Sequence, residues 1–122
     1  MIMANSILIV ENSELVVEKL RKLLGSIPDV EIMGDTADSY TAVRMIKEDN
    51  PDYVILDLSL NFGHGIKVLE DISDMEKKPC VIVLTNMNYQ YYKDKCLKLG
   101  ASHFFDKAME FEKVYDILSS VN

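Results

Sequence analysis

The sequence predicts an α/β domain in which a five-stranded parallel sheet is covered by helices on both faces. Three observations support this prediction. Strand-like and helix-like segments alternate five times along the chain. Three of the strand-like segments, at 7–10, 53–56 and 80–84, are nearly continuous apolar runs, which is typical of strands buried on both faces. The connections are short, so a single domain accounts for all 122 residues.

The first strand and helix follow from an apolar run and its stop signals. Residues 7–10 read Ile-Leu-Ile-Val and predict a buried strand. Asn12 or Ser13 caps the helix that follows, since both side chains can accept a hydrogen bond from the first helical turn. Apolar residues then recur at helical spacing until Gly25 ends the helix.

The second strand and helix are separated by a polar segment. Pro28-Asp29 turns the chain into a short strand at 30–33, and residues 34–39 are expected to form a loop. Asp38 or Ser39 caps the next helix, in which the apolar residues of 42–46 face the core.

The third strand is predicted at 53–58, directly after the breaker Asn50-Pro51. A loop of small residues with two glycines, Gly63 and Gly65, leads into a helix with apolar residues at 66, 69 and 72. The segment Lys77-Lys78-Pro79 ends this helix.

The last two strand–helix units complete the alternation. A strand at 80–84 precedes a helix at about 89–99, and Gly100 stands just past its end, where a left-handed residue is favoured. A short strand at 103–105 follows. The final helix is expected to bury Phe111, Val114, Tyr115 and Leu118, which are spaced i, i+3, i+4 and i+7.

Composition and charge limit the partners of this domain. The net charge of −7 argues against binding the nucleic-acid backbone or an anionic membrane, since both favour a basic patch. An acidic chain with a few special carboxylates instead suits a divalent cation. Cys80 and Cys96 show neither metal-ligand spacing nor a disulfide pattern, which predicts a cytoplasmic location. The first apolar run, 7–10, is too short for a signal peptide or a membrane span.

Polar residues follow four of the predicted strands at the point where each strand ends. In a parallel sheet these ends share one edge, which is where ligands bind. Each residue alone has an ordinary structural explanation, such as a strand-end acid facing water, but their agreement favours a common site. The residues are Glu11, Asn12, Asp57, Thr85, Asn86 and Lys107.

These residue types fit phosphoryl transfer to Asp57. A carboxylate can act as a nucleophile and form an acyl phosphate. The charge on the transferred group must be neutralised, and a magnesium ion held by Glu11, Asn12, Asp57 and a nearby backbone carbonyl would do part of this. Lys107 would add a fixed positive charge, and Thr85 a hydroxyl donor.

The order and spacing of these motifs resemble the receiver domain of two-component response regulators. The resemblance covers nearly the whole chain, as a single receiver domain over residues 1–122. It depends on Ile7 to Asn12, on Asp57 with Gly65 eight positions later, on Val83-Leu84-Thr85, on Leu99-Gly100-Ala101 and on Lys107 followed by Phe111. It implies a flavodoxin-like, doubly wound fold with strand order 2-1-3-4-5.

The resemblance also implies roles for individual residues. Asp57 would be the phosphoacceptor, and the donor would be a phosphohistidine on a histidine kinase or a phosphotransfer protein. Such a protein is a self-phosphorylating switch and not an enzyme that turns over a separate substrate. The implied Mg²⁺ ligands are Glu11, Asn12, Asp57 and the backbone carbonyl of Ser59; the implied switch residues are Thr85 and Phe104, and Lys107 contacts the phosphate.

Phosphorylation would be read at a protein-binding surface. If Thr85 moves toward the phosphoryl group, Phe104 can fill the space that it leaves, which couples the site to the fourth helix, fifth strand and fifth helix. Some of Tyr89, Tyr91 and Tyr92 must be exposed there, and exposed tyrosines suit a downstream protein partner. Dimerisation through this surface stays open, as does the choice between a stand-alone receiver and a piece of a longer regulator.

Several residues depart from the family pattern. Asn12 stands where an aspartate is usual, which predicts weaker magnesium binding. Ala108 replaces the usual proline, so the bond before it is either trans or strained. The side chain of Asp106 is expected to point away from that of Lys107. Asn61 replaces another common proline, which predicts a more mobile loop.

The two histidines and the overall function each allow more than one interpretation. His64 is expected to be an exposed loop residue, with a role in modulating dephosphorylation as the alternative, and His103 is expected to be a strand residue near the surface. A pseudo-receiver that binds partners without phosphorylation is the main alternative, supported only by Asn12 and Ala108. A flavodoxin-like redox domain would need a phosphate-binding loop after the first strand. A phosphatase of the haloacid dehalogenase type would need an acid at Ser59.

Overall fold

Strands and helices alternate along the whole of the computed structural model, which describes residues 5–120. This alternation confirms the predicted α/β class. The elements are β1 (Asn5–Val10), α1 (Glu14–Leu24), β2 (Val30–Thr36), α2 (Ser39–Asp49), β3 (Tyr53–Leu56), α3 (Gly65–Asp71), β4 (Cys80–Thr85), α4 (Gln90–Lys98), β5 (His103–Asp106) and α5 (Lys113–Ser119).

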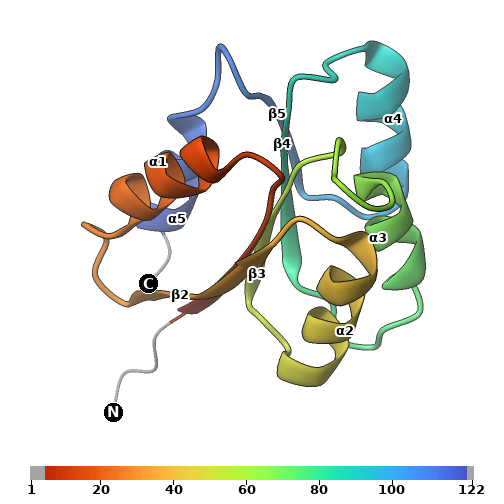
Figure 1. Cartoon of the computed structure of the whole chain (residues 1–122), viewed down its shortest axis with the longest axis horizontal. Coiled ribbons are helices and arrows are strands. Elements are labelled where there is room, and N and C mark those ends of the chain that lie inside the picture. The colour runs from red at the N-terminus through yellow and green to blue at the C-terminus, as the bar shows by residue number, and fades with distance from the viewer. Residues whose placement is uncertain (1–4, 121–122) are drawn as a thin grey trace.

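The five strands form one parallel sheet in the order β2-β1-β3-β4-β5 (Figure 1). This is the strand order that the resemblance implies. Because all strands run the same way, their carboxyl ends lie together at what we call the carboxyl edge of the sheet. Their amino ends lie at the opposite, amino edge.

The core has two layers, one on each face of the sheet, as the apolar strands predict. Ile7 and Ile9 of β1 point into the layer under α1 and α5. Leu8 and Val10 point into the layer under α2, α3 and α4. Figure 1 shows α1 and α5 on one face of the sheet and these three helices on the other. All four side chains are fully buried, so β1 contributes to both layers. A strand in this position is held rigidly, and so is the residue that follows it.

The second strand is longer than predicted. It continues through Gly34, Asp35 and Thr36, where the sequence suggested a polar loop. Asp35 and Thr36 pair in register with Ile9 and Val10 of β1. β2 is the outermost strand of the sheet and pairs only with β1. Backbone hydrogen bonds to that one neighbour maintain the strand even where its side chains are polar, so the hydropathy of the sequence does not predict its length.

Smaller differences concern element ends and burial. The third strand ends at Leu56, before the predicted 58, and Asp106 is the last residue of β5. Tyr115 was expected in the core but is 36% exposed, because it lies on the solvent side of the short α5. Phe111 precedes α5 and is half-buried. Of the alternative caps, Ser13 caps α1 and Asp38 caps α2.

The described helices have at most 11 residues, and the two cysteines differ in burial. Cys80 is half-buried and Cys96 is buried, and both are free thiols. Burial raises the pKa of the Cys96 thiol to about 11, so it stays protonated at neutral pH. Between residues 5 and 120, the helices lack the length and hydropathy that crossing a lipid bilayer requires.

Candidate functional site

The carboxyl edge of the sheet holds the polar residues that were predicted to meet there. Glu11 directly follows β1, Asp57 directly follows β3, and Lys107 directly follows β5. Asp57 and Lys107, together with the end of β4 and the start of α1, surround an open cleft of about 510 Å³. The cleft is lined by Asn12, Ser13, Val16, Asp57, Ser59, Thr85, Asn86, Met87, Tyr89 and Lys107.

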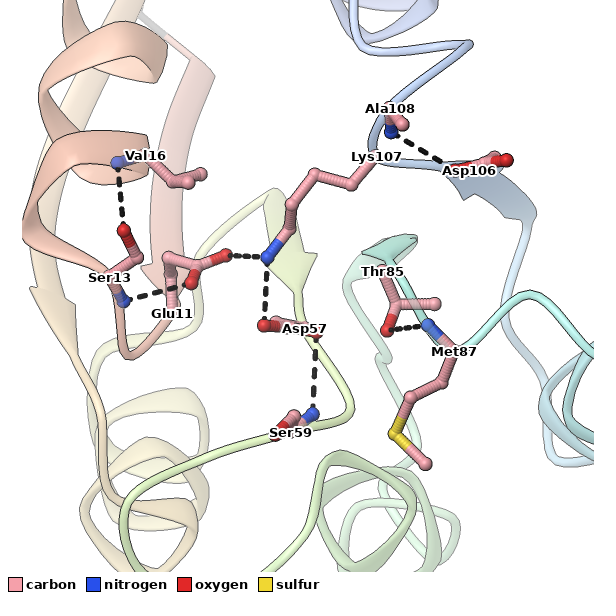
Figure 2. A network of polar contacts seen from close by, with 10 residues as sticks. All are labelled: Glu11, Ser13, Val16, Asp57, Ser59, Thr85, Met87, Asp106, Lys107 and Ala108. Atoms are coloured by element: carbon pink, nitrogen blue, oxygen red, sulfur yellow. Dashed lines mark hydrogen bonds and ion pairs between the residues drawn. The ribbon is translucent and has the colours of Figure 1, made fainter.

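One lysine links two buried carboxylates at the centre of this edge. The Lys107 ammonium lies 2.8 Å from Glu11 Oε1 and 2.9 Å from Asp57 Oδ2 (Figure 2). Glu11 and Asp57 are each only 4% exposed. Two acids and one cation leave this cluster with a formal charge of −1. Buried charges are costly unless paired, so the cluster needs Lys107.

The other oxygen of each carboxylate is also bonded. Glu11 Oε2 accepts a hydrogen bond from the Ser13 backbone N–H at 2.9 Å. Asp57 Oδ1 accepts one from the Ser59 N–H at 3.3 Å. These bonds fix the orientation of both carboxylates (Figure 2). Sequence reasoning treated Ser13 only as a helix cap, a role that it also has, since its Oγ accepts from Val16 N–H.

Burial and pairing shift the pKa values of this cluster. Burial raises the pKa of Glu11, and its hydrogen bonds to Lys107 and Ser13 only partly offset the effect. Burial alone would lower the pKa of Lys107, but the hydrogen bonds to Glu11 and Asp57 outweigh it and raise that pKa. Lys107 is therefore a fixed positive charge at neutral pH.

The two residues expected to switch lie on neighbouring strands. Thr85 is completely buried, and its Oγ1 accepts a hydrogen bond from Met87 N–H at 3.1 Å (Figure 2). Its backbone carbonyl accepts from Lys107 N–H at 2.9 Å. Phe104 on β5 pairs in register with Val83 and is half-buried against the α2, α3 and α4 layer. Thr85 thus touches the Lys107 backbone directly.

The oxygen-rich cleft suits a hard cation, although acidic ligands are few. Within residues 5–120, His, Cys, Asp and Glu form no group of three or more that could hold a metal. The available donors are the Asp57 carboxylate, the exposed Asn12 amide and the backbone of the exposed Ser59. Glu11 lines a second cleft that shares Asn12 with the first. Mg²⁺ prefers oxygen ligands and retains several waters, so this donor set fits it chemically.

The segment after β5 resolves one question left by the sequence. The peptide bonds within residues 5–120 are all trans, so the bond between Lys107 and Ala108 carries no cis strain. The Asp106 side chain bonds to Asn88 and to Ala108 and not to the Lys107 ammonium. It therefore does not compete with Glu11 or Asp57, as the sequence predicts.

The loop after Asp57 is attached to α2. Asn61 N–H donates to the Ala37 carbonyl at 3.1 Å, and Ser39 N–H donates to the Phe62 carbonyl at 3.0 Å. These bonds constrain the loop backbone, and the greater mobility expected from Asn61 stays a prediction. His64 was expected to be an ordinary surface residue, which is wrong: it is half-buried and its Nδ1 accepts from Ile66 N–H at 3.1 Å, so it caps α3.

Residues 7–119 match the profile of the response regulator receiver domain. The chain belongs to this family. Protein CcdB of Bacillus subtilis is 32% identical over 115 residues, which are 94% of this chain and 95% of the relative. Chemotaxis protein CheY of Halobacterium salinarum is 29% identical over 119 residues, 98% of each chain.

Solved structures agree with this assignment. A DNA-binding response regulator of the LuxR family from Staphylococcus aureus superposes with a TM-score of 0.83 at 26% identity. The match covers 92% of this receiver domain and 93% of the neighbour. The chain is thus a response regulator receiver domain, and the strand order implied by the resemblance is that of its family.

Proposed function

We propose that this receiver domain accepts a phosphoryl group on Asp57 and uses it to switch a protein-binding surface. One observation carries the proposal: the buried Asp57 carboxylate is fixed against Lys107 and also lines the open cleft. A histidine kinase or a phosphotransfer protein would supply the phosphoryl group from a phosphohistidine. The domain would be a self-phosphorylating switch and would not turn over a separate substrate.

The side chains suit the charges of this reaction. An Asp57 oxygen attacks the phosphorus, a P–O bond forms, and the P–N bond to the donor imidazole breaks, leaving the electron pair on that nitrogen. Lys107 lies 2.9 Å from Asp57 Oδ2 and would offset part of the negative charge that the phosphoryl group adds. A carboxylate already oriented by Lys107 and the Ser59 N–H needs little further movement to react.

We assign Mg²⁺ as the cofactor, with Glu11, Asn12, Asp57 and the backbone carbonyl of Ser59 as its ligands. When bound, the ion would neutralise charge on the phosphoryl oxygens. Asn12 supplies an oxygen but no charge, so binding should be weaker than with an aspartate there. In the absence of metal, Lys107 already offsets one of the two buried carboxylates.

The output would pass through Thr85 and Phe104. A phosphoryl group on Asp57 offers the Thr85 hydroxyl a new acceptor in place of its contact with Met87 N–H. The readout surface is that of α4, β5 and α5, where Tyr89 and Tyr91 are 70% and 65% exposed. Exposed tyrosines suit a protein partner, and this surface is also where a homodimer could form.

Three further assignments rest on the sequence. The net charge of −7 favours a protein partner over direct contact with nucleic acid or an anionic membrane. The free thiols Cys80 and Cys96 favour a cytoplasmic location. We treat residues 1–122 as a single receiver domain.

The alternative is a pseudo-receiver that binds its partner without phosphorylation. Asn12 and Ala108 were its support, and Ala108 causes no cis strain. The paired arrangement of Asp57 and Lys107 favours the switch, because a binding module has no need for a costly buried charge cluster.

Intact mass spectrometry separates these two functions. The protein is incubated with acetyl phosphate and MgCl₂, beside Asp57→Asn and beside a sample containing EDTA. We expect one phosphoryl adduct on the parent with magnesium and none on Asp57→Asn. A parent that stays unmodified, or a variant modified equally, would contradict the proposed function.

A further inference from the structure

Asp106 occupies a distinctive position beside the phosphoacceptor site. It is the last residue of β5, next to Lys107, and it is half-buried. Its backbone N–H donates to Glu110 Oε1 at 3.0 Å, and its carbonyl accepts from Glu110 N–H at 2.8 Å. Glu110 in turn pairs with Lys113 at 2.7 Å. Asp106 is thus fixed through its main chain before its side chain is considered.

One side-chain oxygen of Asp106 shapes the chain around Lys107. Oδ1 accepts a hydrogen bond from Ala108 N–H at 3.0 Å, which closes a local turn with Lys107 at its centre (Figure 2). Proline, the residue that the family usually has here, lacks a backbone N–H and could not make this bond. In this chain, therefore, a side-chain hydrogen bond constrains a segment that a proline ring would otherwise constrain.

The second oxygen connects this turn to the loop that follows Thr85, the last residue of β4. Oδ2 accepts from Asn88 Nδ2 at 3.0 Å. Beside it, Lys107 N–H donates to the Thr85 carbonyl at 2.9 Å. Two bonds therefore join the end of β4 and the loop after it to the end of β5 and the residue after it. One comes from the Lys107 backbone and the other is accepted by the Asp106 side chain. Both bonds limit how the Lys107 main chain can rotate.

We propose that Asp106 is a positioning residue that aims the Lys107 ammonium at Asp57. A lysine side chain has many rotamers, and its charge is useful only where it meets both Glu11 and Asp57. Fixing the Lys107 backbone from both sides lowers the entropy cost of holding that geometry. Asp106 itself does not touch the reacting atoms, and this inference rests on the proposed function.

The first experiment measures the rate of phosphorylation by acetyl phosphate in magnesium. Asp106→Ala loses both side-chain bonds, whereas Asp106→Asn keeps an acceptor for Ala108 N–H. We expect Asp106→Ala to be slower by about tenfold, since small misplacements of a catalytic group are costly, and Asp106→Asn to stay within about twofold of the parent. The matched control is Asp52→Ala, which removes an acid that joins chain segments at the amino edge.

A double-mutant cycle distinguishes positioning from general stabilisation. If Asp106 acts through Lys107, the variant Asp106→Ala/Lys107→Ala reacts no more slowly than Lys107→Ala alone. If Asp106 supports the site in some other way, the two effects multiply. Multiplied effects, or an unchanged rate in Asp106→Ala, would overturn the inference. Thermal unfolding of all variants shows whether the rates follow stability instead.

A second measurement does not depend on phosphorylation. In ¹H–¹⁵N NMR spectra, the paired Lys107 ammonium should exchange its protons slowly in the parent, in Asp106→Asn and in Asp52→Ala, and rapidly in Asp106→Ala. Slow exchange in Asp106→Ala would contradict the inference. A parent that takes up no phosphoryl group would refute the proposed function, while the NMR result would still decide the role of Asp106.

Discussion

The two edges of the sheet use aspartates in opposite ways. At the amino edge, Asp52 is exposed and its Oδ2 accepts from Ser6 N–H at 2.8 Å. At the carboxyl edge, Asp57 is buried and shares a lysine with Glu11. Asp52 precedes β3 and Asp57 follows it. Because an exposed aspartate is sufficient at one end of this strand, the fold by itself does not require a buried, lysine-paired aspartate at the other end. The difference supports the carboxyl edge as the proposed site of phosphorylation.

Removing the cation at the carboxyl edge should have the largest effect. Lys107→Met leaves two buried carboxylates without their partner, and we expect the free energy of unfolding to fall by about 3 kcal/mol in metal-free buffer. Asp52→Ala, at the amino edge, should lower the free energy of unfolding by only about 1 kcal/mol. Urea denaturation at pH 7 measures both. Equal losses of unfolding free energy in the two variants would mean that the carboxyl edge depends on its charge pairing no more than the amino edge does.

Two glycines extend the comparison to the backbone. A Cβ on Gly65, at the carboxyl edge, would meet the Asp57 carbonyl oxygen and would lie 2.7 Å from Leu58 Cα. A Cβ on Gly100, near the amino edge, would meet nothing within 4 Å, although φ there is +106°. We therefore expect Gly65→Ala to lose about 2 kcal/mol of stability and to slow phosphorylation. Gly100→Ala should lose about 1 kcal/mol and react at the parent rate.

Urea denaturation and acetyl phosphate kinetics on the two glycine variants give this test. A normal phosphorylation rate in Gly65→Ala would show that the Asp57 carboxylate tolerates displacement of its own backbone. Slow phosphorylation in Gly100→Ala would show instead that the reaction depends on general stability.

Asn12 tests how charge at the carboxyl edge sets metal affinity. Asn12→Asp adds a carboxylate within the cleft, and we expect Mg²⁺ to bind about tenfold more tightly, or about 1.4 kcal/mol. Asn50→Asp adds the same charge after α2, at the amino edge, and should change affinity less. Isothermal titration calorimetry measures both. Equal affinities in the parent and Asn12→Asp would contradict the assigned ligand role.

The smallest expected effect concerns pH and His64. Burial lowers the pKa of His64 below its ordinary value of 6.5. The negative charge of Asp57 acts in the opposite direction, and the positive charge of Lys95 lowers this pKa further. The unfolded chain therefore binds the proton more readily, so stability should fall as the pH drops below about 6.5 and through the folded pKa. His64→Asn keeps a side chain that can cap α3 but does not titrate. The variant should therefore lose less unfolding free energy between pH 7 and pH 5, with a difference from the parent of less than about 1 kcal/mol. Urea denaturation at pH 7 and pH 5 compares the two proteins; an identical pH dependence would rule out this contribution.

The sequence was sufficient for the sheet because its strands are apolar on both faces. The runs at Ile7 to Val10 and at Cys80 to Leu84 have few other stable placements, and the residues that follow such strands must gather at one edge. The extension of β2 to Thr36 was missed because it depends on pairing with β1, which leaves no trace in hydropathy.

The contacts around the site were harder to predict than its members. The sequence indicated that Glu11, Asp57 and Lys107 belong together, but not that one ammonium would pair with both acids. Asp106 was noted only as a side chain pointing elsewhere. The available signal was an aspartate, Asp106, two residues before Ala108, whose backbone N–H can donate to it. Such local bonds between an aspartate and the backbone are too common for the sequence alone to single this one out.

Mapping the modified residue tests the central claim most directly. The protein is treated with acetyl phosphate and magnesium, the acyl phosphate is reduced with borohydride, and the modified peptide is sequenced by mass spectrometry. The account predicts reduction at Asp57 alone, with Asp52, which precedes the same strand, unmodified. Reduction at Asp52 or Glu11, or no reduction at any carboxylate, would contradict it.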